Sequence, residues 1–205
     1  LEESTGTDTP LKKILRAPVF WVFMLLMVCA GASEQAIGQW ASAFAESGLR
    51  VSKTIGDLAG PCMFAVLMGT SRALYAKLSE KIDLTKAMFA SGVLCIISYL
   101  IATLSPSPAL SLVGCGLCGL SVGLFWPGTF SLAAKTLPGS TAMFALFALA
   151  GDLGCSVGPT VVGGVSGMFD GSLKTGLLAA IAFPVLLCIG LFLYRRHKTH
   201  LNNEK

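Results

Sequence analysis

Long apolar stretches alternate with short polar breaks along this chain. The stretches lie at 17–44, 54–76, 85–104, 108–132, 141–168 and 173–194. Each has roughly 20 to 28 residues, enough for a helix that rises about 1.5 Å per residue to cross about 30 Å of hydrocarbon. Most of them lack the polar stripe that a helix of a soluble protein shows. The pattern therefore predicts an all-α membrane protein with six transmembrane helices.

Composition agrees with this interpretation, because 54% of the residues are hydrophobic and only 13% are charged. A soluble domain carries about 25% charged residues. Glycine, proline, serine or charged residues mark every break, at 48–50, 79–83, 105–108, 137–140 and 170–171.

The basic residues separate onto two sides of the predicted membrane. Of the 15 Lys and Arg residues, 12 fall on one side: Lys12, Lys13, Arg16, Arg72, Lys77, Lys81, Lys86, Lys135, Arg195, Arg196, Lys198 and Lys205. Positive residues gather on the cytoplasmic side. We therefore expect a multi-pass protein of the cell membrane (plasma or inner) with both termini in the cytoplasm. The net charge of +4 then reflects topology and not a nucleic-acid partner.

The sequence divides into a polar cytoplasmic linker (1–16), a six-helix bundle (17–194) and a cytoplasmic tail (195–205). The linker begins with Leu1 and has no apolar core, which is unlike a signal peptide and typical of a piece of a longer protein.

The sequence contains few motifs that would indicate an enzyme or a cofactor-binding protein. The seven Cys residues all fall in apolar stretches, and we interpret Cys115-Gly-Leu-Cys118 as helix packing. Ser166 lies in a Gly-x-Ser-Gly sequence, but the two His residues are both in the tail, so this serine has no base. No phosphate-binding P-loop occurs. We expect neither an enzyme nor a bound metal or cofactor.

An internal repeat accompanies the six stretches. Gly56-Asp57-Leu58 recurs 95 positions later as Gly151-Asp152-Leu153, and Gly60-Pro61 recurs 98 positions later as Gly158-Pro159. Three helices separate the copies, so the second unit would enter the membrane from the opposite side, as in secondary transporters. Chance similarity between glycine-rich helices remains the alternative.

Three motifs resemble those of the major facilitator superfamily. Residues 31–38 (Gly-Ala-Ser-Glu-Gln-Ala-Ile-Gly) resemble a stretch in the seventh helix of fucose permease-type sugar–proton symporters. Residues 154–164 resemble the family's GxxxGPxxGG packing motif, and 69–77 resemble its basic cytoplasmic loop, although Ala73 and Ala76 replace the expected Asp and Gly.

This resemblance covers essentially the whole chain and implies the C-terminal six-helix half of a twelve-helix carrier. The partners it implies are the N-terminal half, the lipid bilayer and a small-molecule substrate. It also implies alternating access and coupling to a proton or ion gradient.

Glu34 is the sharpest candidate for a substrate-binding residue, because an ionisable group inside a membrane span normally faces a cavity or a partner. Gln35, Gln39 and Ser42 follow on one helical stripe, and Trp40 lies beside it. Amides and an aromatic face suit a polyol. The alternative is that Glu34 pairs with a neighbouring helix.

Asp152 and Trp126 are the remaining substrate-binding candidates. Asp152 lies about 16 Å into the fifth stretch, near the midplane, where Gly151 and Gly154 would allow a local break. A structural helix–helix hydrogen bond is the alternative role for Asp152. Trp126 would line or gate a cavity, or anchor the helix at the membrane interface.

A set of glycines and prolines predicts close helix packing and gating: Gly60, Pro61, Gly119, Gly123, Pro127, Gly154, Gly158 and Pro159. Pro127 should kink the fourth stretch.

The sequence thus predicts half of a secondary active transporter for a small solute, with a neutral sugar preferred because Arg72 is expected at the cytoplasmic end of its span, away from the midplane. The alternatives are a drug or metabolite exporter of the same superfamily, or a six-helix protein that dimerises.

Overall fold

The computed structural model describes residues 14–203, and these form an all-helical bundle without strands. The helices are α2 (Pro18–Gly38), α3 (Ala41–Ala43), the π-helix η1 (Phe44–Gly48), α4 (Lys53–Leu78), α5 (Leu84–Leu104), α6 (Pro108–Val122), α7 (Phe125–Thr136), α8 (Thr141–Met168), α9 (Leu173–Ala179) and α10 (Ala182–Asn203). The all-α prediction is confirmed for these residues. Most of the expected linker lies outside them.

Five helical segments are long and apolar enough to cross a membrane: Pro18–Gly38, Leu84–Leu104, Pro108–Thr136, Thr141–Met168 and Leu173–Arg196. They correspond to five of the six expected spans. The expected span 54–76 forms α4, which has 26 residues but is not among the five. Arg72 and the small polar residues beside it lower its mean hydropathy. The count of six spans therefore stays a prediction.

Helix starts follow side-chain capping. Ser52, Asp83, Ser140 and Ser172 precede α4, α5, α8 and α9, and each accepts a hydrogen bond from a backbone N–H in the first turn. Such caps satisfy donors that the helix itself leaves unpaired.

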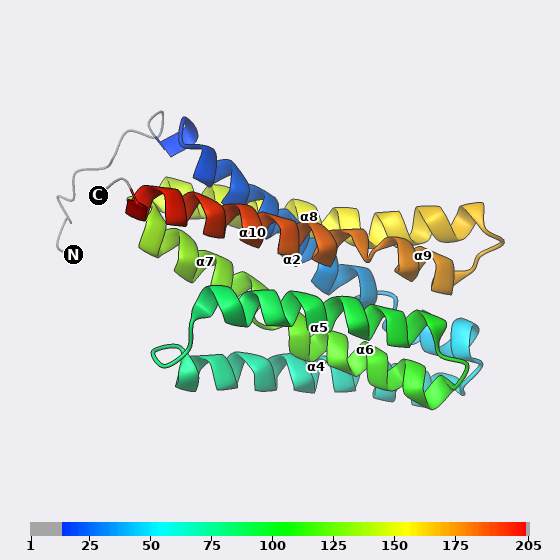
Figure 1. The fold of residues 1–205 in the computed structure, drawn as a ribbon. Helices are drawn as coiled ribbons and strands as arrows, with labels where there is room; N and C mark the ends of the chain where they lie inside the picture. Colours follow the sequence, from blue (N-terminus) through cyan, green and yellow to red (C-terminus); the bar gives the residue numbers. More distant parts are fainter. Residues whose placement is uncertain (1–13, 204–205) are drawn as a thin grey trace, which may run out of the picture.

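Two prolines explain breaks inside the fourth and sixth predicted spans. Pro127 and Pro184 have no N–H to donate to the carbonyls of Gly123 and Ala180, four residues earlier. The helix is interrupted at those carbonyls, between α6 and α7 and between α9 and α10. The start of α2 and the end of α10 lie at the same end of the bundle (Figure 1).

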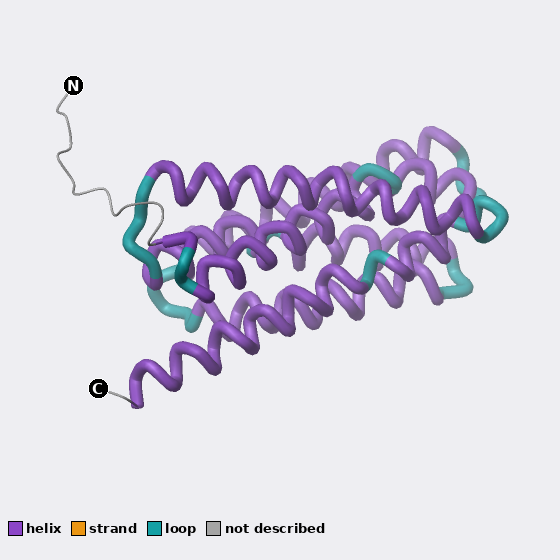
Figure 2. Tube along the Cα trace, turned by 90° about the horizontal axis from the view of Figure 1, so that it is seen from above, coloured by secondary structure: helices purple, strands orange, loops and turns teal. Residues whose placement is uncertain are grey.

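The helices form two groups joined side by side. α2 packs on α8 and α10, while α6 packs on α4 and α5, and contacts of α2 with α7 and of α5 with α10 join the groups. Figure 2, turned by 90°, shows the same elongated bundle connected by short loops. Rings of Phe20, Phe23, Phe147 and Tyr194 pack in the first group, with centroids 5.2 Å apart for Phe20–Phe147 and 5.3 Å for Phe23–Tyr194.

Candidate functional site

Glu34 and Arg72 form an ion pair between α2 and α4. The Nη2 atom of Arg72 lies 3.5 Å from Oε2 of Glu34. The Glu34 side chain is only 13% exposed, whereas that of Arg72 is 46% exposed. Glu34 therefore has a helix partner, which was one of the two roles expected for it.

Arg72 lies near the C-terminal end of α4, and its depth in the membrane stays a prediction. Its backbone lies six residues before the end of α4, about 9 Å along the helix axis. The long side chain then reaches Glu34, which lies in the fifth turn of α2. Within residues 14–203, this is the one polar contact of a guanidinium that carries five N–H donors.

The polar stripe that begins at Gln35 does not lie on one continuous helix. The expected span 17–44 is interrupted after Gly38, and the chain continues from Trp40 as α3 and then as the π-helix. Gln35 is half-buried and Gln39 is exposed. Ser42 donates a hydrogen bond to Oδ1 of Asp57 on α4. Ser42 therefore contacts α4 and does not extend the stripe of α2.

Trp40 connects the end of α2 to α8. Its Nε1 atom donates a hydrogen bond to the carbonyl oxygen of Pro159 at 3.1 Å. A Cβ added to Gly163 would lie 3.0 Å from the indole ring, so the ring also covers α8 there. The polar atom of Trp40 is thus used inside the protein, and only its half-buried ring is left to contact a solute.

Trp126 lies on α7 with its indole ring against Gly151 of α8. The centroid of its ring is 6.4 Å from that of Phe130. Its Nε1 atom is buried, and the described part of the chain offers it no acceptor. A buried donor without an acceptor is costly, and in a binding protein it is a natural contact for a ligand or an ordered water.

Asp152 follows Gly151 on α8 and is exposed. Among the side chains that the structure describes, no basic one pairs with it. Ser156 and Thr160, which are also exposed, lie one and two turns further along the same stripe, and Ser156 donates a hydrogen bond to the Asp152 carbonyl. The expected local break is absent, because α8 runs uninterrupted from Thr141 to Met168.

Cys155 links Asp152 to the part of α2 that carries Glu34. It lies one turn after Asp152 on α8. A Cβ added to Gly31, one turn before Glu34, would lie 3.0 Å from Sγ of Cys155. The structure thus brings Glu34, Arg72 and Asp152 towards one polar face formed by α2, α4 and α8, which we call the polar face.

Glycines carry the tightest helix contacts beside this face. A Cβ on Gly154 or Gly158 would overlap the backbone of Val28 or Ala32 in α2. A Cβ on Gly119 would overlap the backbone of Phe64 in α4, and one on Gly123 would crowd Met68 and Ser71. Gly60 lies against Ala41. Pro61 and Pro159 lie inside helices that are not interrupted near them, whereas Pro127 directly follows the break between α6 and α7.

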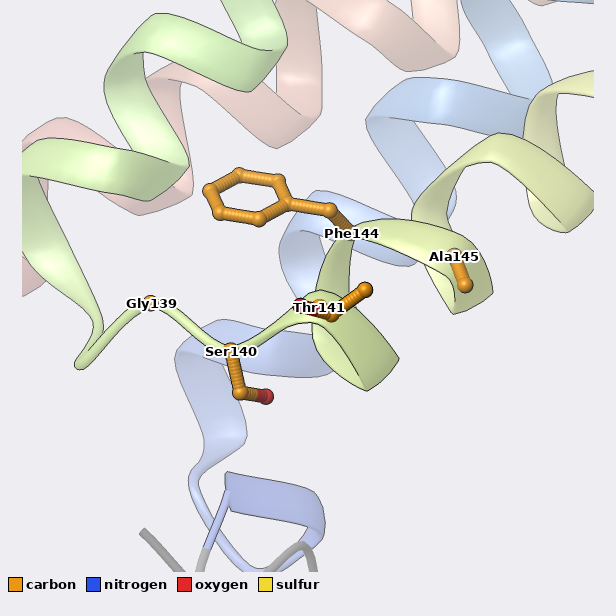
Figure 3. Close-up of a pocket in the computed structure, with 5 residues that line it drawn as sticks. All are labelled: Gly139, Ser140, Thr141, Phe144 and Ala145. Atoms are coloured by element: carbon orange, nitrogen blue, oxygen red, sulfur yellow. The ribbon is translucent and has the colours of Figure 1, made fainter. Parts of the chain in front are cut away.

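A surface depression lies elsewhere, at the turn between α7 and α8. It is lined by Gly139, Ser140, Thr141, Phe144 and Ala145 (Figure 3). It contains no charged side chain, and none of the expected site residues lines it. We place the candidate site on the polar face because ionisable side chains gather there.

The polar face offers hydrogen bonds and charge, without a metal site. No group of three or more His, Cys, Asp or Glu side chains within residues 14–203 is arranged to hold a metal ion. Glu34, Asp152 and Trp126 were predicted from the sequence and stay predictions as site residues, whereas the contact of Arg72 with Glu34 was not predicted. The sequence offered one indication of this contact, which was the presence of a charged residue in an otherwise apolar span.

Comparison with known proteins identifies the family to which the chain belongs. No curated protein matches the chain. The family model described as Major Facilitator Superfamily matches residues 2–159, which is more than half of the 205 residues. Together with the apolar helices, this match shows a multi-pass membrane protein from a family of transporters and not of enzymes. The chain belongs to the Major Facilitator Superfamily of membrane transporters.

Proposed function

We propose that this chain is the C-terminal six-helix half of a secondary active transporter that moves a small polar solute by alternating access. The proposal assigns two inverted three-helix repeats to the bundle and places both termini in the cytoplasm. The polar face would meet the N-terminal half and line the path between them, since carriers of this kind bind solutes between such units.

The Glu34–Arg72 pair is the observation that carries this proposal. Charged groups at membrane depth are costly and normally mark a substrate or ion path. The pair has no net charge, and its one 3.5 Å contact leaves both groups able to bond solute hydroxyls. A neutral sugar is therefore the first solute to test. Protonation of Glu34 would weaken the pair, which gives a route to proton coupling.

The polar face also presents groups suited to a polyol. Trp126 has an unused buried N–H, and Asp152 has no basic partner among the side chains that the structure describes. Gln35 and Gln39 stay in the proposed site as amides near Glu34. The half-buried Trp40 ring offers an apolar surface beside them.

Arg72 gives specific support to one rival, a transporter of a metabolite anion. Its remaining donors would bind a carboxylate or phosphate when Glu34 is protonated. In that case uptake would be restricted to anions, and Arg72→Lys would weaken binding because a lysine lacks the two-pronged donor geometry.

Uptake by vesicles that hold the complete gene product tests the proposal. The panel contains radiolabelled sugars and small organic anions, with and without a pH gradient. Wild type is compared with Glu34→Gln and with Glu46→Gln, a control in the exposed part of η1. We expect gradient-dependent uptake of one sugar that Glu34→Gln removes and Glu46→Gln keeps.

The other outcomes are equally informative. Uptake that Glu34→Gln leaves intact would remove Glu34 from the transport site. Uptake of anions alone would replace the sugar by the rival solute class. Uptake that ignores the pH gradient would contradict proton coupling.

A further inference from the structure

Two buried cysteines lie where α5 packs on α6, away from the polar face. They are Cys95 on α5 and Cys118 on α6. Both side chains are fully buried. We call these two residues the thiol pair.

The packing of α5 on α6 determines how the thiol pair is placed. A Cβ added to Gly114 of α6 would lie 2.6 Å from the backbone N of Ala102 and 2.9 Å from the carbonyl oxygen of Ser98, both on α5. The two helices are joined by a short turn, so their directions are opposed (Figure 1). Cys118 lies one turn after Gly114, and Cys95 lies about one turn before Ser98. The opposed directions of the helices therefore place the two cysteines at the same level of the α5–α6 contact.

Two further cysteine thiols lie near the thiol pair. Cys115 is one turn before Cys118 and is also fully buried. Sγ of Cys188 on α10 lies 2.5 Å from the position that a Cβ on Gly92 of α5 would take. Within the described residues, no three His, Cys, Asp or Glu side chains are arranged as a metal cage. Zinc, which takes four ligands in structural sites, therefore does not fit.

We propose that the thiol pair is a binding site for a soft, two-coordinate cation, with mercury(II) as the test ion. Thiolates select soft metals, and two opposed sulfurs provide the two ligands that such an ion accepts. In the reaction with HgCl₂, two S–H bonds break and two Hg–S bonds form. Two chloride ions leave, both protons pass to water or buffer, and no electron is transferred.

Burial decides which reagents reach the site. A charged reagent would have to enter apolar surroundings without its water, whereas neutral HgCl₂ dissolves in the hydrocarbon phase. Cys62 on α4 is exposed and therefore open to both kinds of reagent. A bridge between the thiols would also tie α5 to α6 and stabilise their packing, as other cross-links do.

The test uses the complete gene product with Cys62→Ser as the parent protein. One equivalent of HgCl₂ is added, followed by a glutathione wash that strips mercury from single thiols, and bound mercury is counted. We expect Cys95→Ala, Cys118→Ala and the double variant each to lose the same single equivalent. Cys29→Ala, which removes a buried thiol of α2, should lose none.

A second measurement needs no variant. Mercury should raise the Tm of the parent protein by about 4–16 °C, the range for a cross-link in a chain of this size. Mass spectrometry of its digest should show the Cys95 and Cys118 peptides joined by mercury. Full mercury retention in Cys95→Ala, or mercury bridging other peptides, would overturn the proposal.

Discussion

Two helix pairs in this bundle are packed through glycines, and they are covered to different extents. In the α2–α8 pair, Gly154 and Gly158 meet the backbone of α2, and α2 has 12 buried residues. In the α4–α6 pair, Gly119 meets the backbone of α4, but only Gly56, Gly60 and Phe64 of α4 are buried. Close packing at glycines thus occurs both for α2, which is in the core, and for α4, which is at the edge of the bundle.

The difference suggests distinct roles for the two pairs. α2 is held on several sides and presents Glu34 from a fixed position. α4 has most of its surface uncovered by the rest of the chain, yet it supplies Arg72 and Asp57. A helix that is this polar and this uncovered suits an inner surface of the complete carrier better than one facing lipid.

Adding volume to the core pair should have the largest effect. Gly154→Val would force side-chain carbons into the backbone of Val28, where a helix cannot relax locally. We expect a loss of about 3 kcal/mol or more in the free energy of unfolding. Thermal unfolding in detergent measures it, with Gly69→Val as a control because no atom lies within 4 Å of a Cβ there. Equal Tm values for the two variants would contradict the packing.

The same change in the edge pair should cost less. Gly119→Val overlaps the backbone of Phe64, but α4 can move outward because little of it is buried. We expect a loss of about 2 kcal/mol. Hydrogen exchange should quicken across 53–78 and stay slow in α2. If α2 exchanged as fast as α4, the two pairs would unfold as one unit and the comparison would fail.

Arg72→Gln removes the ion pair between α2 and α4, one of the contacts between the two pairs. It leaves the carboxylate of Glu34, which is mostly buried, without its partner. We expect a loss of about 1–2 kcal/mol, and less for Glu34→Gln because Arg72 is half-exposed and can be hydrated. Thermal unfolding of both variants at equal ionic strength measures the difference. A larger loss for Glu34→Gln would reverse the assignment of the buried partner.

The smallest effect is expected at the end of the core pair. Trp40→Phe removes the hydrogen bond to the Pro159 carbonyl and keeps most of the ring. We expect a loss of about 1 kcal/mol. Trp21→Phe is the matched control, because this exposed indole also donates to a backbone carbonyl, that of Leu15. Losses of equal size would show that the Trp40 contact adds nothing specific to the core pair.

Sequence patterns predicted what depends on local chemistry. Five of the expected spans are helices of membrane length. Mean hydropathy depends on neighbouring residues alone, so a single sequence contains it.

Contacts between helices were beyond such patterns. The break after Gly38 coincides with the bond from Trp40 to α8, which is 119 positions away in sequence. The reach of Arg72 to Glu34 depends on the rotation and depth of two helices and on a long side chain. Spacing along the chain specifies neither. For the same reason the repeat between the two halves of the bundle stays a prediction.

Accessibility to water tests most directly whether the polar face lines a transport path. Ser156→Cys on α8 and Ile189→Cys on α10, both at exposed positions, are compared in a background where Cys62 and Cys155 are serine. A charged, membrane-impermeant thiol reagent is applied to the complete carrier in vesicles. We predict that it modifies Ser156→Cys, that transported solute slows this reaction, and that Ile189→Cys in the lipid stays unmodified. Equal protection of both positions without solute would show that the polar face meets lipid, and would contradict the account.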